Sequence, residues 1–512
     1  MNYWNQTLQE VTPKSTFNFI LVFLIKLNMS LFVKKSIEGL LAQASDSEKG
    51  LKRSLGPVNL IALGIGAIIG AGLFVRTAAA AGESAGPAVI ISFIIAAVGC
   101  AFAGLCYAEF ASMIPVAGSA YTYAYATMGE FVAWIIGWAL VLEYALASAT
   151  VSIAWSEYLN NLLRSFDLGA IPYEWSHSPF ETSPEGVTGI MNIPAFFIIA
   201  ALSLILIKGT KESALVNAII VVVKVSIVLI FIFLGWGYIN QDNYTPFMIP
   251  ESTGHEGFFQ HGWGGVLNGA GVVFFAFIGF DAVSTAAQES KNPKRDMPIG
   301  ILGSLVVCTL LYILFSHVLT GVANYKDFVV AGKEASVAYA IQHYMPGFDW
   351  LAKLITLAIL AGFSSVILVM LLGQSRVFYS MSNDGLIPKV FAELHPKFRT
   401  PYKSNIILLF FVGIFAAFIP GSVAGDLTSI GTLFAFVLVC VGIWVLRVKN
   451  PSLERPFKTP LVPFVPIMGM LVCSAMIISL DTLTQLSALV WMVIGLFVYF
   501  LYSRKHSHLR NQ

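Results

Sequence analysis

Residues 64–72 read GIGAIIGAG, with four glycines among nine positions inside a long apolar run. Glycine weakens an α-helix because it loses the most backbone freedom on folding and has no side chain to pack. The GxGxxxG spacing differs from the GxGxxG of a dinucleotide-binding loop, and the context is not strand–turn–helix. Two interpretations remain: close helix packing through small residues, or an unwound segment whose free N–H and C=O groups face a polar ligand.

A second glycine-interrupted stretch lies at 269–281, where Gly269 and Gly271 are followed by FFAFIGFD. Paired broken helices in corresponding positions of two halves are typical of inverted repeats with a binding site between them. A broken helix offers N–H groups to a carboxylate and C=O groups to an ammonium. An amino acid presents both groups, although a sugar or a nucleobase could use the same backbone atoms.

The composition is that of a membrane protein. Of 512 residues, 57% are hydrophobic and only 11% are charged, and the mean hydropathy is +0.77. Soluble domains carry roughly 25% charged residues. Because so few charges cannot cover a water-facing surface, the composition argues against a soluble enzyme, a disordered protein and a nucleic-acid-binding protein.

Apolar stretches of the right length recur along the chain. About 20 apolar residues in a helix cross the ~30 Å hydrocarbon core, and the lack of an alternating pattern favours helices over a barrel. The sequence predicts an all-α integral membrane protein with twelve transmembrane helices, near 58–81, 88–109, 131–155, 192–208, 214–239, 263–287, 298–322, 351–376, 404–420, 427–447, 461–480 and 484–502. The glycine breaks fall in helices 1 and 6. This order predicts a five-plus-five inverted repeat with two appended helices.

The basic residues indicate the orientation, because cytoplasmic loops are enriched in Lys and Arg. With the N-terminus inside, 24 of the 30 basic residues fall on the cytoplasmic side, five fall outside and Lys224 lies within a span. We therefore expect both termini in the cytoplasm and the chain in the plasma membrane, as a bacterial inner-membrane protein. The inward-facing segment 115–129, which carries three tyrosines, is expected to form a short lying helix that helps to close the inner side. The alternative is that these tyrosines lie at the membrane–water interface, as aromatic residues commonly do, without closing the inner side.

Domain boundaries follow from these spans. We expect a cytoplasmic N-terminal segment over 1–56, a ten-helix core over 57–447, helices 11 and 12 over 448–503, and a cytoplasmic tail over 504–512. The apolar run 17–33 is too short to span, is interrupted by Lys26 and lacks a cleavage motif. Since Met29 opens a plausible natural start, residues 1–28 are interpreted as a start-site artefact or a loosely attached extension.

Three ionisable residues lie inside predicted spans, where a charge is costly and usually functional. Lys224 lies 11 residues past Ser213, or ~16 Å along a helix and close to the midplane. Its neighbours offer no counter-ion, so we expect it to take and release a proton; the alternative is a lysine held by carbonyls of a broken helix, without a proton role. For Glu143 and Asp281 we weigh substrate binding, pairing with a lysine, a conformational role and a satisfied contact between helices.

Five stretches together resemble the amino acid–polyamine–organocation superfamily, specifically bacterial members of the cationic amino acid transporter family. They are GIGAIIGAGLFV (64–75), CYAEFASMIPVAGSAYTYAYATMG (106–129), FFAFIGFDAVSTAAQESKNPKRDMP (274–298), QSRVFYSMSNDGLIP (374–388) and NPSLERPFKTP (450–460). The resemblance covers nearly all of residues 34–502. It implies the five-plus-five inverted-repeat fold and a secondary amino acid permease that works by alternating access.

The resemblance also implies a substrate site built from backbone groups. The family's carboxylate cradle falls on Ala71 and Gly72. Its amine-binding carbonyls fall on Ile68, Phe275, Ala276 and Ile278. Ala71 stands where relatives often carry Thr or Ser, so a hydroxyl contact is lost while a backbone N–H role remains.

The resemblance also implies roles for individual side chains. Lys224 matches the lysine that replaces a sodium site in proton-coupled relatives, and Phe280 resembles the aromatic that gates the site. Phe363 and Ser364 are the side chains expected to size the substrate's R group. Gln288 stands where many relatives have Glu, which weakens the expectation of an acidic cytoplasmic gate.

The implied function is proton-coupled uptake of small neutral amino acids such as alanine, since the expected pocket positions are apolar or small apart from Glu143. The alternatives are a cationic amino acid (arginine or lysine) transporter, an exchanger without net proton coupling, and a channel or nutrient sensor. The sequence has no P-loop or HExxH motif and no ligand-spaced histidines, which argues against an enzyme. The expected partners are an amino acid, protons and the lipid bilayer, with no metal, cofactor or nucleic acid; the oligomeric state is left open.

Overall fold

The computed structural model describes residues 31–40, 55–70, 72–116, 118–208, 213–250, 258–259, 261–287, 290–330, 336–398 and 400–510. Residues 1–28, interpreted above as an artefact or extension, lie outside these ranges. Within them the chain is helical, with only two isolated β-bridges and no strand. The predicted all-α class is confirmed.

The first half of the described chain contains the first glycine-interrupted helix, three long apolar helices (α6, α8 and α10) and the shorter apolar helix α9. Its α-helices are α4 (Pro57–Ile68), α5 (Thr77–Ala80), α6 (Val89–Met113), α7 (Ser119–Thr127), α8 (Glu130–Ser165), α9 (Ile193–Lys208) and α10 (Ser213–Gly235). Short π and 3-10 segments η1 (Gly72–Arg76), η2 (Ala81–Ala85) and η3 (Gly86–Ala88) join α4 to α6.

The second half begins with the other interrupted helix. Its main helices are α11 (Gly262–Val273), η7 (Phe274–Phe277), α12 (Ala282–Thr285), α13 (Pro293–Val322), α14 (Asp327–Val330), α15 (Ser336–Tyr344), α16 (Asp349–Asn383), α17 (Tyr402–Phe418), α18 (Gly421–Lys449), α19 (Phe464–Ser479), α20 (Thr482–Val498) and α21 (Arg504–His506). Each of the twelve apolar stretches expected from the sequence overlaps a helix.

The helices are apolar enough for a multi-pass membrane protein. Among the described residues, eight helices are long and apolar enough to cross a membrane, and four further apolar helices have 10–17 residues. Many large hydrophobic side chains face outward, including Phe233 at 81% exposure and Leu501 at 69%. Such exposure is costly in water but suits contact with lipid.

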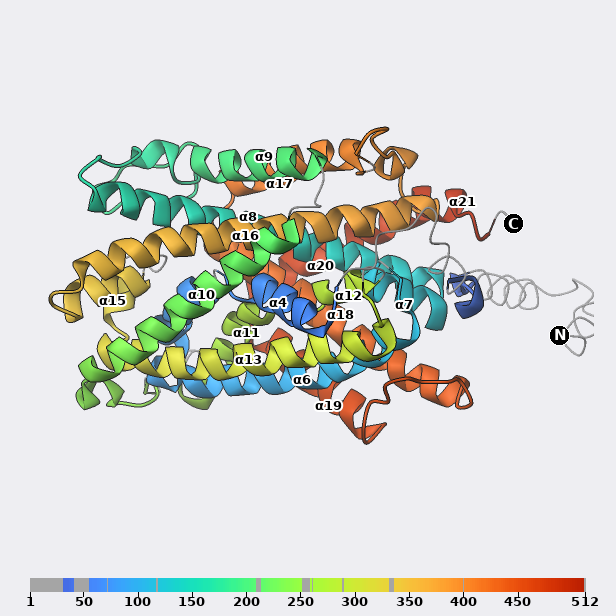
Figure 1. Cartoon of the computed structure of the whole chain (residues 1–512), viewed down its shortest axis with the longest axis horizontal. Coiled ribbons are helices and arrows are strands. Elements are labelled where there is room, and N and C mark those ends of the chain that lie inside the picture. Colours follow the sequence, from blue (N-terminus) through green and yellow to red (C-terminus); the bar gives the residue numbers. More distant parts are fainter. Residues whose placement is uncertain are drawn as a thin grey trace, which may run out of the picture.

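The glycine-interrupted helices lie inside the bundle. Figure 1 shows α4, α11 and α12 in the middle of the molecule, among longer helices that run across the view. At one end, where α7 and α21 lie, the Lys35 N–H donates to the Tyr125 carbonyl at 3.3 Å and the His508 N–H donates to the Asp384 carbonyl at 3.0 Å. Segments expected on the cytoplasmic side therefore meet at the same end of the molecule.

The expected short helix in 115–129 is present as α7. Its three tyrosines are fully buried, so the alternative of interfacial aromatics is wrong. The Tyr121 hydroxyl donates to Asp384 at 2.6 Å and the Tyr125 hydroxyl donates to Glu130 at 2.9 Å. These bonds tie α7 to the loop after α16 and to the start of α8.

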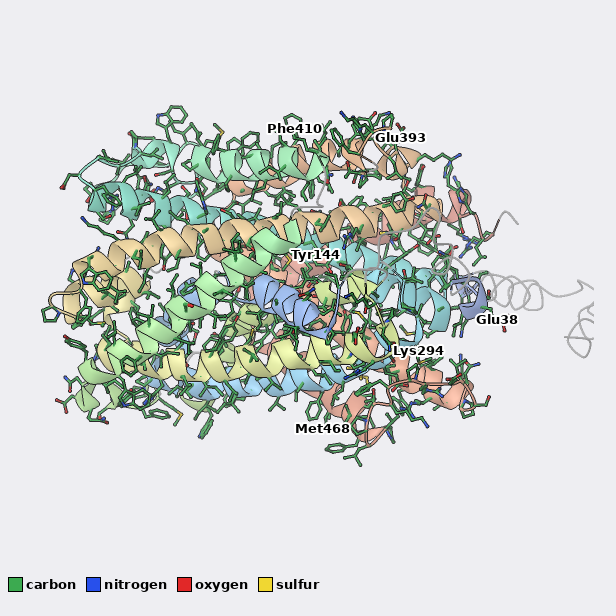
Figure 2. The ribbon with its side chains drawn as sticks, viewed as in Figure 1. Glu38, Tyr144, Lys294, Glu393, Phe410 and Met468 are labelled. Carbon is green, nitrogen blue, oxygen red and sulfur yellow. The ribbon has the colours of Figure 1, made fainter. Side chains whose placement is uncertain are left out.

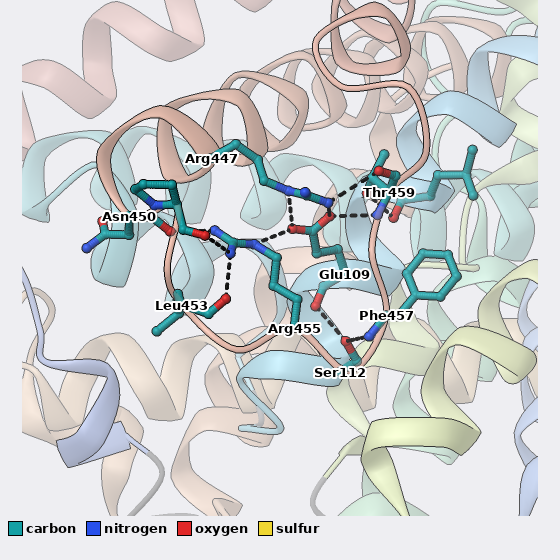
Figure 3. Close-up of polar contacts among 10 residues, drawn as sticks. Glu109, Ser112, Arg447, Asn450, Leu453, Arg455, Phe457 and Thr459 are labelled. Atoms are coloured by element: carbon teal, nitrogen blue, oxygen red, sulfur yellow. Dashed lines mark hydrogen bonds and ion pairs between the residues drawn. The ribbon is translucent and has the colours of Figure 1, made fainter.

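A buried ion-pair network at the same end holds the loop between α18 and α19 (Figure 3). Glu109 on α6 is fully buried and accepts two hydrogen bonds from Arg447, both at 2.9 Å, and one from Arg455 at 3.1 Å. The Thr459 N–H donates to the same carboxylate at 2.8 Å. Arg455 also donates to the carbonyl of Asn450 at 2.7 Å, so the network fixes the path of the loop.

We expect Glu109→Gln to destabilise the protein by roughly 3 kcal/mol, because removing one partner of a buried pair leaves the other charge without compensation. Thermal unfolding in detergent measures the effect. The matched control is Glu393→Gln, which removes the partner of Lys403 from a largely exposed pair and should change little. Equal melting temperatures for the two variants would contradict the structural role of Glu109.

Candidate functional site

The first helix break begins directly after α4. Ile69 leaves the helical conformation, with φ −74° and ψ 104°, and η1 starts at Gly72. Ala71, the other expected cradle residue, lies outside the described residues. The glycines explain why the helix stops here, because three of the four residues 69–72 are small and two are glycine. Both interpretations of GIGAIIGAG are observed in part: the helix is interrupted after Ile68, and Gly64 packs so closely against α13 that an added Cβ would lie 2.5 Å from the Cβ of Ser304.

The second break follows α11. The chain tightens into the 3-10 turn η7, becomes extended at Ile278 and then turns at Gly279, where φ is +112°. A side chain is strained in that conformation, so glycine is required. The chain becomes helical again at α12.

The two breaks touch through their backbones. A Cβ added to Gly72 would lie 2.6 Å from the Ala276 backbone nitrogen and closer still to its Cα. No L side chain fits such a gap. The two interrupted helices that the sequence predicts therefore lie side by side, and η1 contacts η7 directly.

Tyr312 on α13 bridges the two breaks. Its hydroxyl oxygen lies 3.0 Å from the Ile68 carbonyl and 2.8 Å from the Ala276 carbonyl. One hydroxyl proton can be donated to only one of these acceptors at a time. The other carbonyl keeps a free lone pair. Tyr312 was not identified from the sequence. Its hydroxyl lies in the middle of a predicted span, within CTLLYILF, and polar groups at membrane depth are usually functional, so it could have been named as a candidate.

Lys224 on α10 reaches the first break from the side. Its ammonium donates to the carbonyls of Gly66 at 2.7 Å, Ile69 at 2.9 Å and Gly362 at 3.5 Å, and the side chain is buried. An ammonium has three N–H donors, and all three are used. The arrangement matches the geometry of a lysine held by the carbonyls of a broken helix, and it leaves the proton role untested.

A small cavity lies between the breaks. It has a volume of about 10 Å³, roughly the room for one water molecule. Four of the expected site residues line it: Ile68, Gly72, Phe275 and Ile278. The remaining wall is apolar and comes mainly from Ala147 and Val151 on α8 and from Val366 and Met370 on α16. In this state the cavity is too small for any ligand larger than a water molecule.

Three of the expected side chains do not line this cavity. Phe280 packs against Tyr107 and Phe436, with ring centroids 5.7 and 4.8 Å away. Phe363 packs against Phe74 at 6.2 Å. The Ser364 hydroxyl donates to the carbonyl one turn earlier in its own helix, at 2.9 Å. Val366 and Met370, one to two turns farther along α16, occupy the wall instead.

Glu143 and Asp281 are both fully buried near the second break. The Tyr144 hydroxyl donates to Asp281 Oδ2 at 2.6 Å. Among the described residues, neither Glu143 oxygen has a hydrogen-bond partner and neither carboxylate has an ion-pair partner. Pairing of either acid with a lysine, one of the alternatives weighed above, is therefore absent from the described structure. Asp281 instead joins the segment before α12 to α8, through Tyr144.

A charged pair lies beyond the first break. Arg76, the last residue of η1, forms an ion pair with Asp426 on α18. The Arg76 side chain is 7% exposed and that of Asp426 is 21% exposed, so the pair is partly shielded from solvent. It connects the second part of the broken helix to a helix outside the break. Arg76 is one of the five basic residues that the sequence analysis places on the outer side, and the sequence alone predicts no partner for it.

We expect Gly72→Ala to reduce amino acid uptake at least tenfold, because the added methyl group must push the two breaks apart. Uptake by purified protein in proteoliposomes measures the effect. Gly237→Ala is the matched control, since an added Cβ there meets nothing within 4 Å. Wild-type uptake by the Gly72 variant would show that the contact between the breaks is not needed.

Comparison with known proteins fits this architecture. A family model described as amino acid permease matches residues 55–507. A branched-chain amino acid permease of Bacillus subtilis is 45% identical over 94% of this chain and 99% of its own length. A methylthioribose transporter of the same organism is 42% identical over 94% of this chain and its full length. The vacuolar cationic amino acid transporter 4 of Arabidopsis thaliana is 35% identical over 83% of this chain and 68% of its own length.

The family match covers both helix breaks, the lysine on α10 and every helix that lines the cavity. The match therefore spans the whole region described above as the site. The chain belongs to the amino acid permease family of the amino acid–polyamine–organocation superfamily and is a multi-pass membrane protein of amino acid transport.

Proposed function

We propose that this permease is a proton-coupled symporter of small neutral amino acids that works by alternating access. The contact between the two helix breaks carries the proposal, because it brings backbone groups from both halves of the chain to one cavity. N–H groups at Ala71 and Gly72 would bind the substrate carboxylate. Carbonyls at Ile68, Phe275, Ala276 and Ile278 would bind its ammonium.

The proposed architecture is a five-plus-five inverted repeat over 57–447, two appended helices over 448–503, and cytoplasmic segments over 1–56 and 504–512. Twelve membrane spans would place both termini in the cytoplasm of a bacterial inner membrane. The positions of the breaks support the repeat, and the distribution of basic residues supports the orientation. The contacts of Lys35, Tyr125, Asp384 and His508 at one end of the molecule agree with an even number of spans.

The cavity wall supports a neutral side chain. Ala147, Val151, Val366 and Met370 are apolar, and among the residues that the structure describes no charged side chain lines the cavity. A guanidinium or ammonium side chain would need a counter-ion there. Glu143 lies one turn before Ala147 but is not among the lining residues. The names of the branched-chain permeases of Bacillus subtilis and Lactococcus lactis also favour aliphatic substrates, so alanine and leucine are both candidates.

Lys224 is the proposed proton carrier. Protonated, it holds the end of α4 through two carbonyls and reaches α16 through a third. A neutral amine has two donors and a lone pair, so it would lose at least one of these contacts. Loss of the proton would therefore loosen α10 from the first break. An exchanger that uses Lys224 only as a structural tie is the competing reading.

We expect uptake of labelled alanine and leucine into proteoliposomes to rise severalfold with an inward proton gradient, and arginine uptake to stay low. Preference for arginine would support the cationic alternative. Counterflow without response to the gradient would support the exchanger. Uptake of methylthioribose in place of all three amino acids would overturn the substrate proposal.

We expect Lys224→Ala to retain substrate counterflow but to lose accumulation driven by the proton gradient, because counterflow needs binding without net proton movement. Lys458→Ala, on an exposed loop, controls for loss of a positive charge. Gradient-driven accumulation at the wild-type level in Lys224→Ala would refute the proton role and leave the lysine as a structural tie.

A further inference from the structure

A large groove lies outside the transport site, at the first turns of α13. Its volume is about 740 Å³, and it is bounded on one side by α13 and on the other by the loop between α18 and α19. Lys294 and Arg295 line one part, and the apolar residues Ile299, Leu302 and Phe457 are among those that line the rest. Figure 2 shows Lys294 at this end of α13, on the side of the molecule where Met468 of α19 lies.

The loop that forms the second wall is held in place by buried contacts. The Phe457 N–H donates to the Ser112 hydroxyl at 3.4 Å, and the neighbouring Thr459 N–H donates to Glu109 at 2.8 Å (Figure 3). Arg455, two residues before Phe457, is paired with the same carboxylate. The groove is therefore preformed, because its wall is tied to α6 and α18 by the Glu109 network.

The polar part of the groove is cationic. Lys294 and Arg295 are exposed and have no ion-pair partner among the described residues. The neighbouring Asp296 is buried, and its carboxylate accepts the Asn292 N–H at 3.2 Å, which turns it toward its own helix end. The N-terminus of the 30-residue helix α13 adds partial positive charge at the same place.

The apolar part continues into an exposed face of α13. Ile299, Val306 and Leu310 are 38%, 59% and 58% exposed. Residues at these spacings lie along one side of a helix. A helix that is long and apolar enough to cross a membrane therefore presents two cations at its end and an apolar stripe beginning one turn later.

We propose that this groove binds a phospholipid with an anionic headgroup. The phosphate would lie against Lys294 and Arg295, and an acyl chain would follow Ile299, Leu302 and Val306. Basic pockets at the ends of transmembrane helices attract anionic headgroups. The apolar stripe can contact the acyl chain of a lipid, whereas inorganic phosphate would make no contact with it. The proposal is independent of the transported substrate, since the groove shares no residue with the cavity between the breaks.

The test is a lipid titration. The purified full-length protein is delipidated in neutral detergent, and lipid binding is measured by native mass spectrometry. The probes are phosphatidylglycerol and phosphatidylcholine with the same acyl chains. We expect the wild type to bind phosphatidylglycerol more tightly, and Lys294→Gln/Arg295→Gln to weaken that binding about tenfold or more, since each basic residue contributes ~1 kcal/mol near a charged lipid surface. Binding of phosphatidylcholine should be unchanged.

Lys449→Gln/Lys458→Gln is the matched control, because it removes two exposed cations that do not line the groove. Equal loss in both double variants, or equal affinity of the wild type for the two lipids, would overturn the proposal. Displacement of phosphatidylglycerol by millimolar inorganic phosphate would make this a phosphate site instead. If the double variant does not fold, Arg295→Gln alone should still weaken phosphatidylglycerol binding at least threefold, and an unchanged affinity would equally overturn the proposal.

Discussion

Backbone N–H and C=O groups at membrane depth must find partners inside the protein, because hydrocarbon offers none. A continuous helix meets this demand by itself, whereas a broken helix leaves several groups free. Here the carbonyls at the first break are taken up by Lys224, and Tyr312 reaches a carbonyl of each break. The two breaks are tolerated because α10 and α13 supply these donors.

Lys224 and Tyr312 also limit how the two breaks can rearrange. Both are single side chains with a limited number of N–H or O–H donors, so neither can satisfy additional carbonyls if the breaks rearrange. The surrounding helices are packed so closely that the cavity holds about 10 Å³. A transporter of this design is expected to exchange contacts among its own groups for contacts with substrate, with little empty space at any stage.

At the end of the molecule where α7 and α21 lie, polar networks fix loops rather than helix breaks. Glu109 and Glu130 are fully buried carboxylates, each surrounded by donors from segments far apart in the chain. Glu109 fixes the loop after α18, and Glu130 receives hydrogen bonds from Tyr125 on α7 and from Arg510 in the tail. These networks hold the loops and the tail against the helix ends, and the Glu109 network also fixes the loop that forms one wall of the cationic groove.

The helical class and the positions of both breaks followed from the sequence alone, because hydropathy and glycine content act locally along the chain. That Lys224 lies within a helix of the bundle followed as well, since a charge in an apolar run is visible without any fold. The partners of these groups depended on tertiary structure: Tyr312 between the breaks, Asp426 beside Arg76, and Val366 and Met370 in place of Phe363 and Ser364 on the cavity wall. A helix presents different side chains to a neighbour with every 100° of rotation, and the rotation of α13, α16 and α18 is set only when all the helices pack together.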